Sequence, residues 1–107
     1  ATSEQARSGQ NAMGDAVWSA AETLRETTEW MLDAETADRL AGASDYLAGF
    51  ARVLGGWFHL KATLEDPECA ALARLYANRV LPFAETHCAL ARSGGADLAG
   101  ITSDDLA

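Results

Sequence analysis

Apolar residues recur at intervals of three and four residues in three successive segments of this 107-residue chain. That spacing places them on one side of an α-helix, whereas a half-buried strand would alternate at every second residue. The amino-acid composition agrees with helices, since the chain has 23 alanines and 13 leucines but only three valines and one isoleucine. Such a composition favours helices over strands. The pattern therefore predicts an all-α fold in a single domain.

Breaks in this pattern set the ends of three long helices, which should pack as an antiparallel bundle with a short C-terminal turn. Residues 1–10 are polar, lack an initiator methionine, and are interpreted as a polar tail or a cut end. A connector with room for one helical turn is expected over 35–43, and Ser44 is the expected N-cap of the second helix. The helices are expected at about 11–34, 44–65 and 67–93.

The third helix has the clearest boundary signals. Asp66-Pro67-Glu68 offers an N-cap, a proline at the first helical position and an acid in the first turn. Pro82 should kink the helix, because it lacks an N–H and crowds the preceding turn. Gly94-Gly95 should end it. The bundle domain is therefore expected over 11–95, followed by a C-terminal tail over 96–107.

Large side chains on the stripes are expected to form the core, namely Phe50, Trp57, Tyr76 and Phe83. Truncating Trp57 or Phe83 to alanine should then cost about 3–5 kcal/mol. His87 also lies on the third stripe, where we expect a core histidine that is hydrogen-bonded to a carbonyl or hydroxyl group.

Candidate chemistry is sparse in this sequence. The acidic row Glu22, Glu26, Glu29 and Asp33 could be a metal or acid–base site, but like charges at this spacing are typical of a solvated helix face. A di-iron centre would need Glu-x-x-His motifs, which the sequence lacks. We therefore assign no catalytic, cofactor-binding or metal-binding residue.

Charge and cysteine content restrict the partners and the compartment. A net charge of −8 disfavours nucleic acid, and no apolar run approaches the roughly 20 residues that span a bilayer. On one continuous helix, Cys69 and Cys88 would lie about 28 Å apart, too far for a disulfide bond. We expect free cysteines and a reducing cytoplasm.

Six residues are candidates for an interface. Trp18 and Trp30 flank the stripe of the first helix, where they could cap the rim of the bundle or be covered by another domain or subunit. Four residues off the stripe of the second helix indicate a face that another backbone approaches closely: Arg52, Gly55, Gly56 and His59. A homo-oligomer is expected, because bare apolar patches self-associate.

Three stretches carry a family resemblance: Ala43-Ser44-Asp45-Tyr46-Leu47, Phe50-Ala51-Arg52-Val53-Leu54-Gly55-Gly56-Trp57 and Ala73-Arg74-Leu75-Tyr76-Ala77-Asn78-Arg79-Val80-Leu81-Pro82. Together they make residues 15–95 resemble the extra C-terminal helical domain of bacterial acyl-CoA dehydrogenases. Within these enzymes, the resemblance is to the group similar to methylthiopropanoyl-CoA dehydrogenases.

That resemblance implies a parent flavoenzyme that oxidises an acyl-CoA with FAD. In that family the flavin site, the acyl-CoA pocket and the catalytic glutamate lie upstream, so none is carried over to this chain. The chain itself would be non-catalytic and would pack against the dehydrogenase core and between subunits. The alternative is a free-standing helical protein-interaction module without an enzymatic parent.

Overall fold

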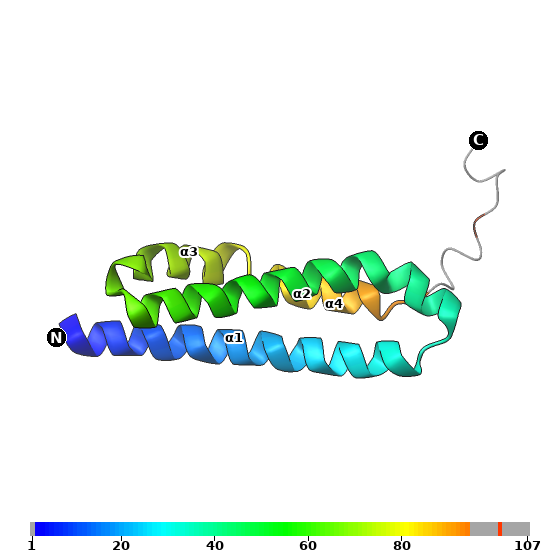
Figure 1. Cartoon of the computed structure of the whole chain (residues 1–107), viewed down its shortest axis with the longest axis horizontal. Helices are drawn as coiled ribbons and strands as arrows, with labels where there is room; N and C mark the ends of the chain where they lie inside the picture. Colours follow the sequence, from blue (N-terminus) through cyan, green and yellow to red (C-terminus); the bar gives the residue numbers. More distant parts are fainter. Residues whose placement is uncertain (1, 95–100, 102–107) are drawn as a thin grey trace.

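The chain folds into an elongated helical bundle with no strand among the residues described by a computed structural model, 2–94 and 101, with side chains from residue 11 onward. Helices α1 (Thr2–Asp33) and α2 (Thr36–Glu65) form an antiparallel hairpin. A short 3-10 helix, η1 (Pro67–Cys69), leads into α3 (Ala70–Arg79) and α4 (Phe83–Ala91), which return along α2 (Figure 1). The predicted all-α bundle is confirmed.

The first two helices are longer than predicted. Helix α1 begins at Thr2 rather than near residue 11, because a formed helix propagates through polar residues at little cost. The connector predicted over 35–43 is wrong, since α2 begins at Thr36. Glu35, in extended conformation, takes the N-cap position that was predicted for Ser44. Gly42 is therefore a packing residue inside α2 and not a break.

The third predicted helix is divided. The Asp66 side chain accepts a hydrogen bond from the Glu68 N–H at 3.0 Å, so the predicted cap is confirmed, although it opens a 3-10 turn. At Pro82 the chain breaks where a kink was predicted: α3 ends at Arg79, and the Leu81 N–H reaches back to the Tyr76 carbonyl. The missing N–H of Pro82 explains why one continuous helix over 67–93 does not form.

The C-terminal end of the bundle follows the predicted stop. Helix α4 ends at Ala91, and Gly94 adopts a positive φ of 77°, the conformation for which glycine is favoured. Apart from Ile101, the predicted tail over 96–107 and its turn lie outside the described residues.

Small side chains make up much of the core, especially between α2 and α4. Helix α2 buries a glycine at every seventh residue, and α4 presents alanine and cysteine to it. The buried apolar residues of the bundle are Met13, Val17, Ala20, Val53, Ala73, Leu81, Ala84, Cys88 and Ala91. Glycine and alanine allow backbones to approach closely, so α4 lies tightly against α2.

Three of the four predicted core aromatics are exposed. Phe50, Trp57 and Phe83 retain 42%, 47% and 56% of their accessible surface, and Tyr76 is half-buried. The prediction was wrong because it followed the largest side chains. In the third helix the buried positions are each one residue beyond the predicted stripe, as with Ala84 next to Phe83.

Candidate interaction surface

A continuous row of exposed positions runs along α2 at alternating intervals of three and four residues. We call it the α2 stripe, and it consists of Leu40, Ala43, Leu47, Phe50, Leu54, Trp57, Lys61 and Leu64. All eight residues are exposed. Lys61 places its ammonium group 5.3 Å from the centre of the Trp57 ring, so its aliphatic stem adds to the apolar surface.

Beside the α2 stripe, an apolar groove separates α1 from α2. It has a volume of about 190 Å³. Its walls are Val17, Ala21, Leu24, Phe50, Val53, Leu54 and Trp57. Helix α4 packs against both long helices, while this groove between the same two helices has no helix of the described chain over it. One side of the α1–α2 hairpin is therefore covered by α4, and the other side, with the groove, is open.

The two candidate tryptophans lie apart. Trp18 is 70% exposed and lies three residues before Ala21, so helical spacing places it beside the open groove. Trp30 is half-buried. Twelve residues separate it from Trp18, which corresponds to about 18 Å along α1 and about 120° around it. The structure does not join them into one patch.

The other four candidate residues lie where the chain already approaches α2 closely. The Tyr76 hydroxyl donates a hydrogen bond to the Arg52 carbonyl at 2.7 Å, and its ring packs against His59 with centroids 4.5 Å apart. A side chain at Gly55 would collide with that hydroxyl group. Gly56 is buried against Leu81 and Val17. This face of α2 is therefore already in contact with α3 and the α3–α4 junction.

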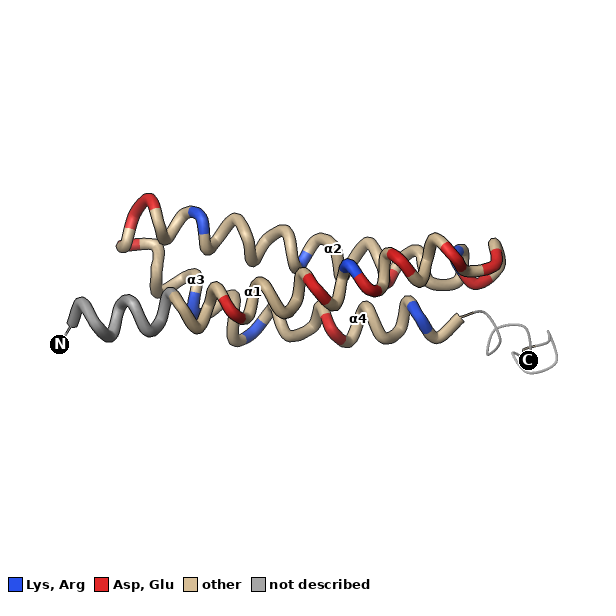
Figure 2. Tube along the Cα trace, turned by 90° about the horizontal axis from the view of Figure 1, so that it is seen from below, with Lys and Arg blue, Asp and Glu red and all other residues tan. Residues whose placement is uncertain are grey.

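The acidic row follows α1 toward the end of the hairpin. Figure 2 shows acidic positions gathered where α1 joins α2, and a second group at the opposite end of α2. Arg25 pairs with Glu22 at 3.1 Å and with Glu29 at 2.8 Å. All three side chains are well exposed, so these pairs contribute little to stability. Among the described residues, no three His, Cys, Asp or Glu side chains come together in a group that could hold a metal ion.

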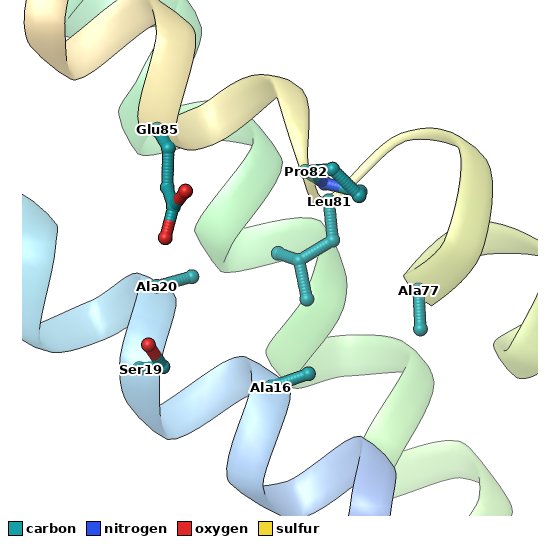
Figure 3. A pocket seen from close by; sticks show the side chains of 7 residues that line it. All are labelled: Ala16, Ser19, Ala20, Ala77, Leu81, Pro82 and Glu85. Atoms are coloured by element: carbon teal, nitrogen blue, oxygen red, sulfur yellow. The ribbon is translucent and has the colours of Figure 1, made fainter.

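A second pocket lies at the α3–α4 break and holds about 210 Å³. Figure 3 shows Glu85 extending from α4 toward Ala20 and Ser19 of α1, with Leu81 and Pro82 on the other side of the view. Both polar side chains are exposed to water. One solvated carboxylate with no second titratable group on the pocket wall is not an acid–base pair.

His87 differs from its predicted environment. Its Nδ1 lies 3.0 Å from an Asp45 carboxylate oxygen, which links α4 to α2. The side chain is partly exposed and bonded to a carboxylate, so the prediction of a core histidine bonded to a carbonyl or hydroxyl group is wrong. The neighbouring Cys88 is buried, and both it and Cys69 are free thiols.

Comparison with known families gives one match. A family model described as acetyl-CoA dehydrogenase C-terminal like matches residues 1–66, more than half of the chain and the whole α1–α2 hairpin. The chain belongs to this family. Searches of curated proteins and of solved structures gave no match. Membership confirms the resemblance to the C-terminal domain of acyl-CoA dehydrogenases, and it places the α2 stripe within the matched region.

The α2 stripe was not predicted as an outer surface, because Phe50 and Trp57 were expected in the core. Leu40, Leu47 and Leu54 lie seven residues apart, a signal that the supposed connector over 35–43 concealed. In the part of the chain that the structure describes, no helix is both long enough and apolar enough to span a bilayer.

Proposed function

We propose that this chain is the non-catalytic C-terminal helical domain of an acyl-CoA dehydrogenase-like flavoenzyme, with a role in packing between domains and subunits. Family membership supports association with a dehydrogenase core. The parent enzyme would remove two hydrogens from an acyl-CoA, with FAD as the hydride acceptor. Two free cysteines fit a reducing cytoplasm as its compartment.

The observation that carries the proposal is the inverted distribution of side-chain size. Glycine, alanine and threonine occupy many of the buried positions, beside Met13, Val17, Val53 and Leu81. Most of the described leucines face outward, as do Phe50, Trp57 and Phe58 of α2. Water does not favour such a surface, and apolar patches of this extent mark interaction sites. An accessory domain held against a larger enzyme would bury these residues in its assembled form.

The two pockets described above are small compared with a flavin site. They measure about 190 and 210 Å³, whereas small-molecule sites start near 300 Å³ and are deeply enclosed. Neither of these two pockets fits FAD. Flavin binding and proton abstraction therefore belong to the upstream domains in this proposal.

Two measurements test the proposal. An antibody against residues 1–107 should capture from source cells a polypeptide that carries flavin and oxidises acyl-CoA. The 107-residue chain alone should fold cooperatively, be colourless, and show no FAD binding in a titration. A captured polypeptide without flavin would favour the free-standing interaction module. Micromolar FAD affinity of the 107-residue chain would contradict the non-catalytic role.

A further inference from the structure

We propose that the α2 stripe is the surface through which two copies of this chain pair, with the two α2 helices antiparallel about a two-fold axis near residue 52. The inference rests on the proposed interface function and names its partner. In this arrangement, helix α2 of a second copy covers the open side of the hairpin.

The spacing of the α2 stripe indicates a helical partner. Its eight positions alternate at three and four residues over nearly the full length of α2, from Leu40 to Leu64. Such a 3.5-residue repeat keeps one seam facing a neighbouring helix along its whole length. The buried glycines already supply the contact with α4 on another side of α2. The stripe is therefore a second seam.

An antiparallel pair places large apolar residues against each other and a small residue against a long one. Leu40 meets the partner's Leu64, and Phe50 meets the partner's Leu54. Leu47 meets the partner's Trp57, and Ala43 leaves room for the long stem of the partner's Lys61. A parallel pair in register would instead oppose two ammonium groups at Lys61 and leave a void between two alanines. Like charges repel and voids destabilise, so the antiparallel order is favoured.

The exposed area is sufficient for a stable pair. The six large apolar residues of the stripe are between 42% and 73% exposed. At roughly 150–250 Å² for each large side chain, they present about 500–800 Å² per copy. Two copies would then bury about 1,000–1,600 Å², which reaches the range of specific interfaces.

The charge of α2 permits self-association even though the chain as a whole is acidic. The helix contains three acids (Asp38, Asp45, Glu65) and three bases (Arg39, Arg52, Lys61), so its net charge is zero against −8 for the full sequence. Two copies that approach along α2 bring neutral helices together. The acidic row on α1 lies outside the stripe.

The groove beside the stripe extends the contact. Phe50, Leu54 and Trp57 belong both to the α2 stripe and to the groove wall. Side chains of the partner helix would enter this groove between α1 and α2. Trp18, exposed at the groove's outer side, would then cover the partner helix, as expected for an aromatic interface residue.

Site-directed cross-linking tests this geometry. Ala51 is exposed one residue beyond Phe50 and close to the predicted axis, so the two copies of residue 51 should face each other. Ala43 is equally exposed on the same helix, but its two copies would lie about 27 Å apart along an antiparallel pair. Ala51→Cys and Ala43→Cys, each with Cys69→Ser, would be treated with a short bifunctional maleimide.

We expect a covalent dimer for Ala51→Cys and at least tenfold less for Ala43→Cys or for Cys69→Ser alone. Equal cross-linking at residues 43 and 51 would indicate a parallel pair and overturn the proposal, as would a lack of dimer at residue 51. The proposed function is tested separately, by whether the polypeptide captured from cells carries flavin. The cross-linking result and the flavin result can each fail without the other.

Discussion

Gly42 allows the close approach of α4 to α2 at Ala91. A Cβ at Gly42 would collide with the backbone carbonyl of Ala91, an atom that cannot swing away as a side chain could. Gly42→Ala should therefore lower the free energy of unfolding by about 1–3 kcal/mol through overpacking, even though alanine is the better helix former. Urea denaturation of the two proteins measures the change.

Gly14→Ala is the matched control. Gly14 lies inside α1 with nothing within 4 Å of its Cβ position. The substitution should raise the free energy of unfolding by about 0.5–1 kcal/mol, the difference in helix propensity. Equal effects of the two substitutions would contradict close α2–α4 packing at Gly42.

Tyr76 joins α3 to α2 through one hydrogen bond. Tyr76→Phe removes the 2.7 Å bond to the Arg52 carbonyl and should lower the free energy of unfolding by about 0.5–1.5 kcal/mol. Thermal unfolding at neutral pH would detect this loss. A Phe variant as stable as the parent would show that the bond contributes nothing.

The same tyrosine should affect stability in alkaline solution. Burial raises the pKa of Tyr76, and the charge of Arg52 opposes that rise in part. The native state then holds the phenolic proton more strongly than the unfolded chain does. Stability should be unaffected below the ordinary pKa of 10.0 and fall as the pH rises above it. Denaturation curves against pH should show a shallower decline for Tyr76→Phe.

At the scale of elements, the junction between α3 and α4 gives a contrast between two residues on either side of Pro82. Leu81 is 3% exposed and lies in the core, whereas the larger Phe83 faces outward. Leu81→Ala should cost about 2–5 kcal/mol, and Phe83→Ala less than about 1 kcal/mol in the isolated chain, as for surface positions. Chemical denaturation ranks the two variants. A larger loss at Phe83 would restore the original prediction of an aromatic core.

Local signals in the sequence predicted the elements better than their packing. The Asp66 cap, the interruption at Pro82 and the stop before Gly94 follow from backbone chemistry that acts within a few residues. The start of α2 was missed because Gly42 has two meanings, a helix break or a close contact. Only the position of Ala91, distant in sequence, decides between them.

The buried face could not be found by following side-chain size. Hydrophobic periodicity weights phenylalanine and tryptophan most strongly, but in this bundle the contacts between α2 and α4 are made mainly by glycine, alanine and cysteine. The prediction consequently took part of an outward surface for the core. Of the candidate site, exposed Trp18 was anticipated, while Gly55 and Gly56 contact the chain's own Tyr76 and Leu81.

At the scale of the whole molecule, the bundle resembles part of a larger core. Helices α1, α2 and α4 pack together, and the apolar groove between α1 and α2 is lined by these two helices alone. Family membership gives a reason for the incompleteness, since a C-terminal domain of a dehydrogenase folds beside other domains. The central claim is that the α2 stripe pairs with the same stripe on a second copy of the chain.

Sedimentation equilibrium of the 107-residue chain and two variants tests that claim most directly. Leu47 on the α2 stripe and Leu72 on α3 are similarly exposed, at 67% and 60%, so glutamate at either position should leave the fold intact. We predict that the unsubstituted 107-residue chain and Leu72→Glu form dimers and that Leu47→Glu is monomeric. A monomeric unsubstituted chain, or a Leu47→Glu variant that dimerises as well as the unsubstituted chain, would contradict the account.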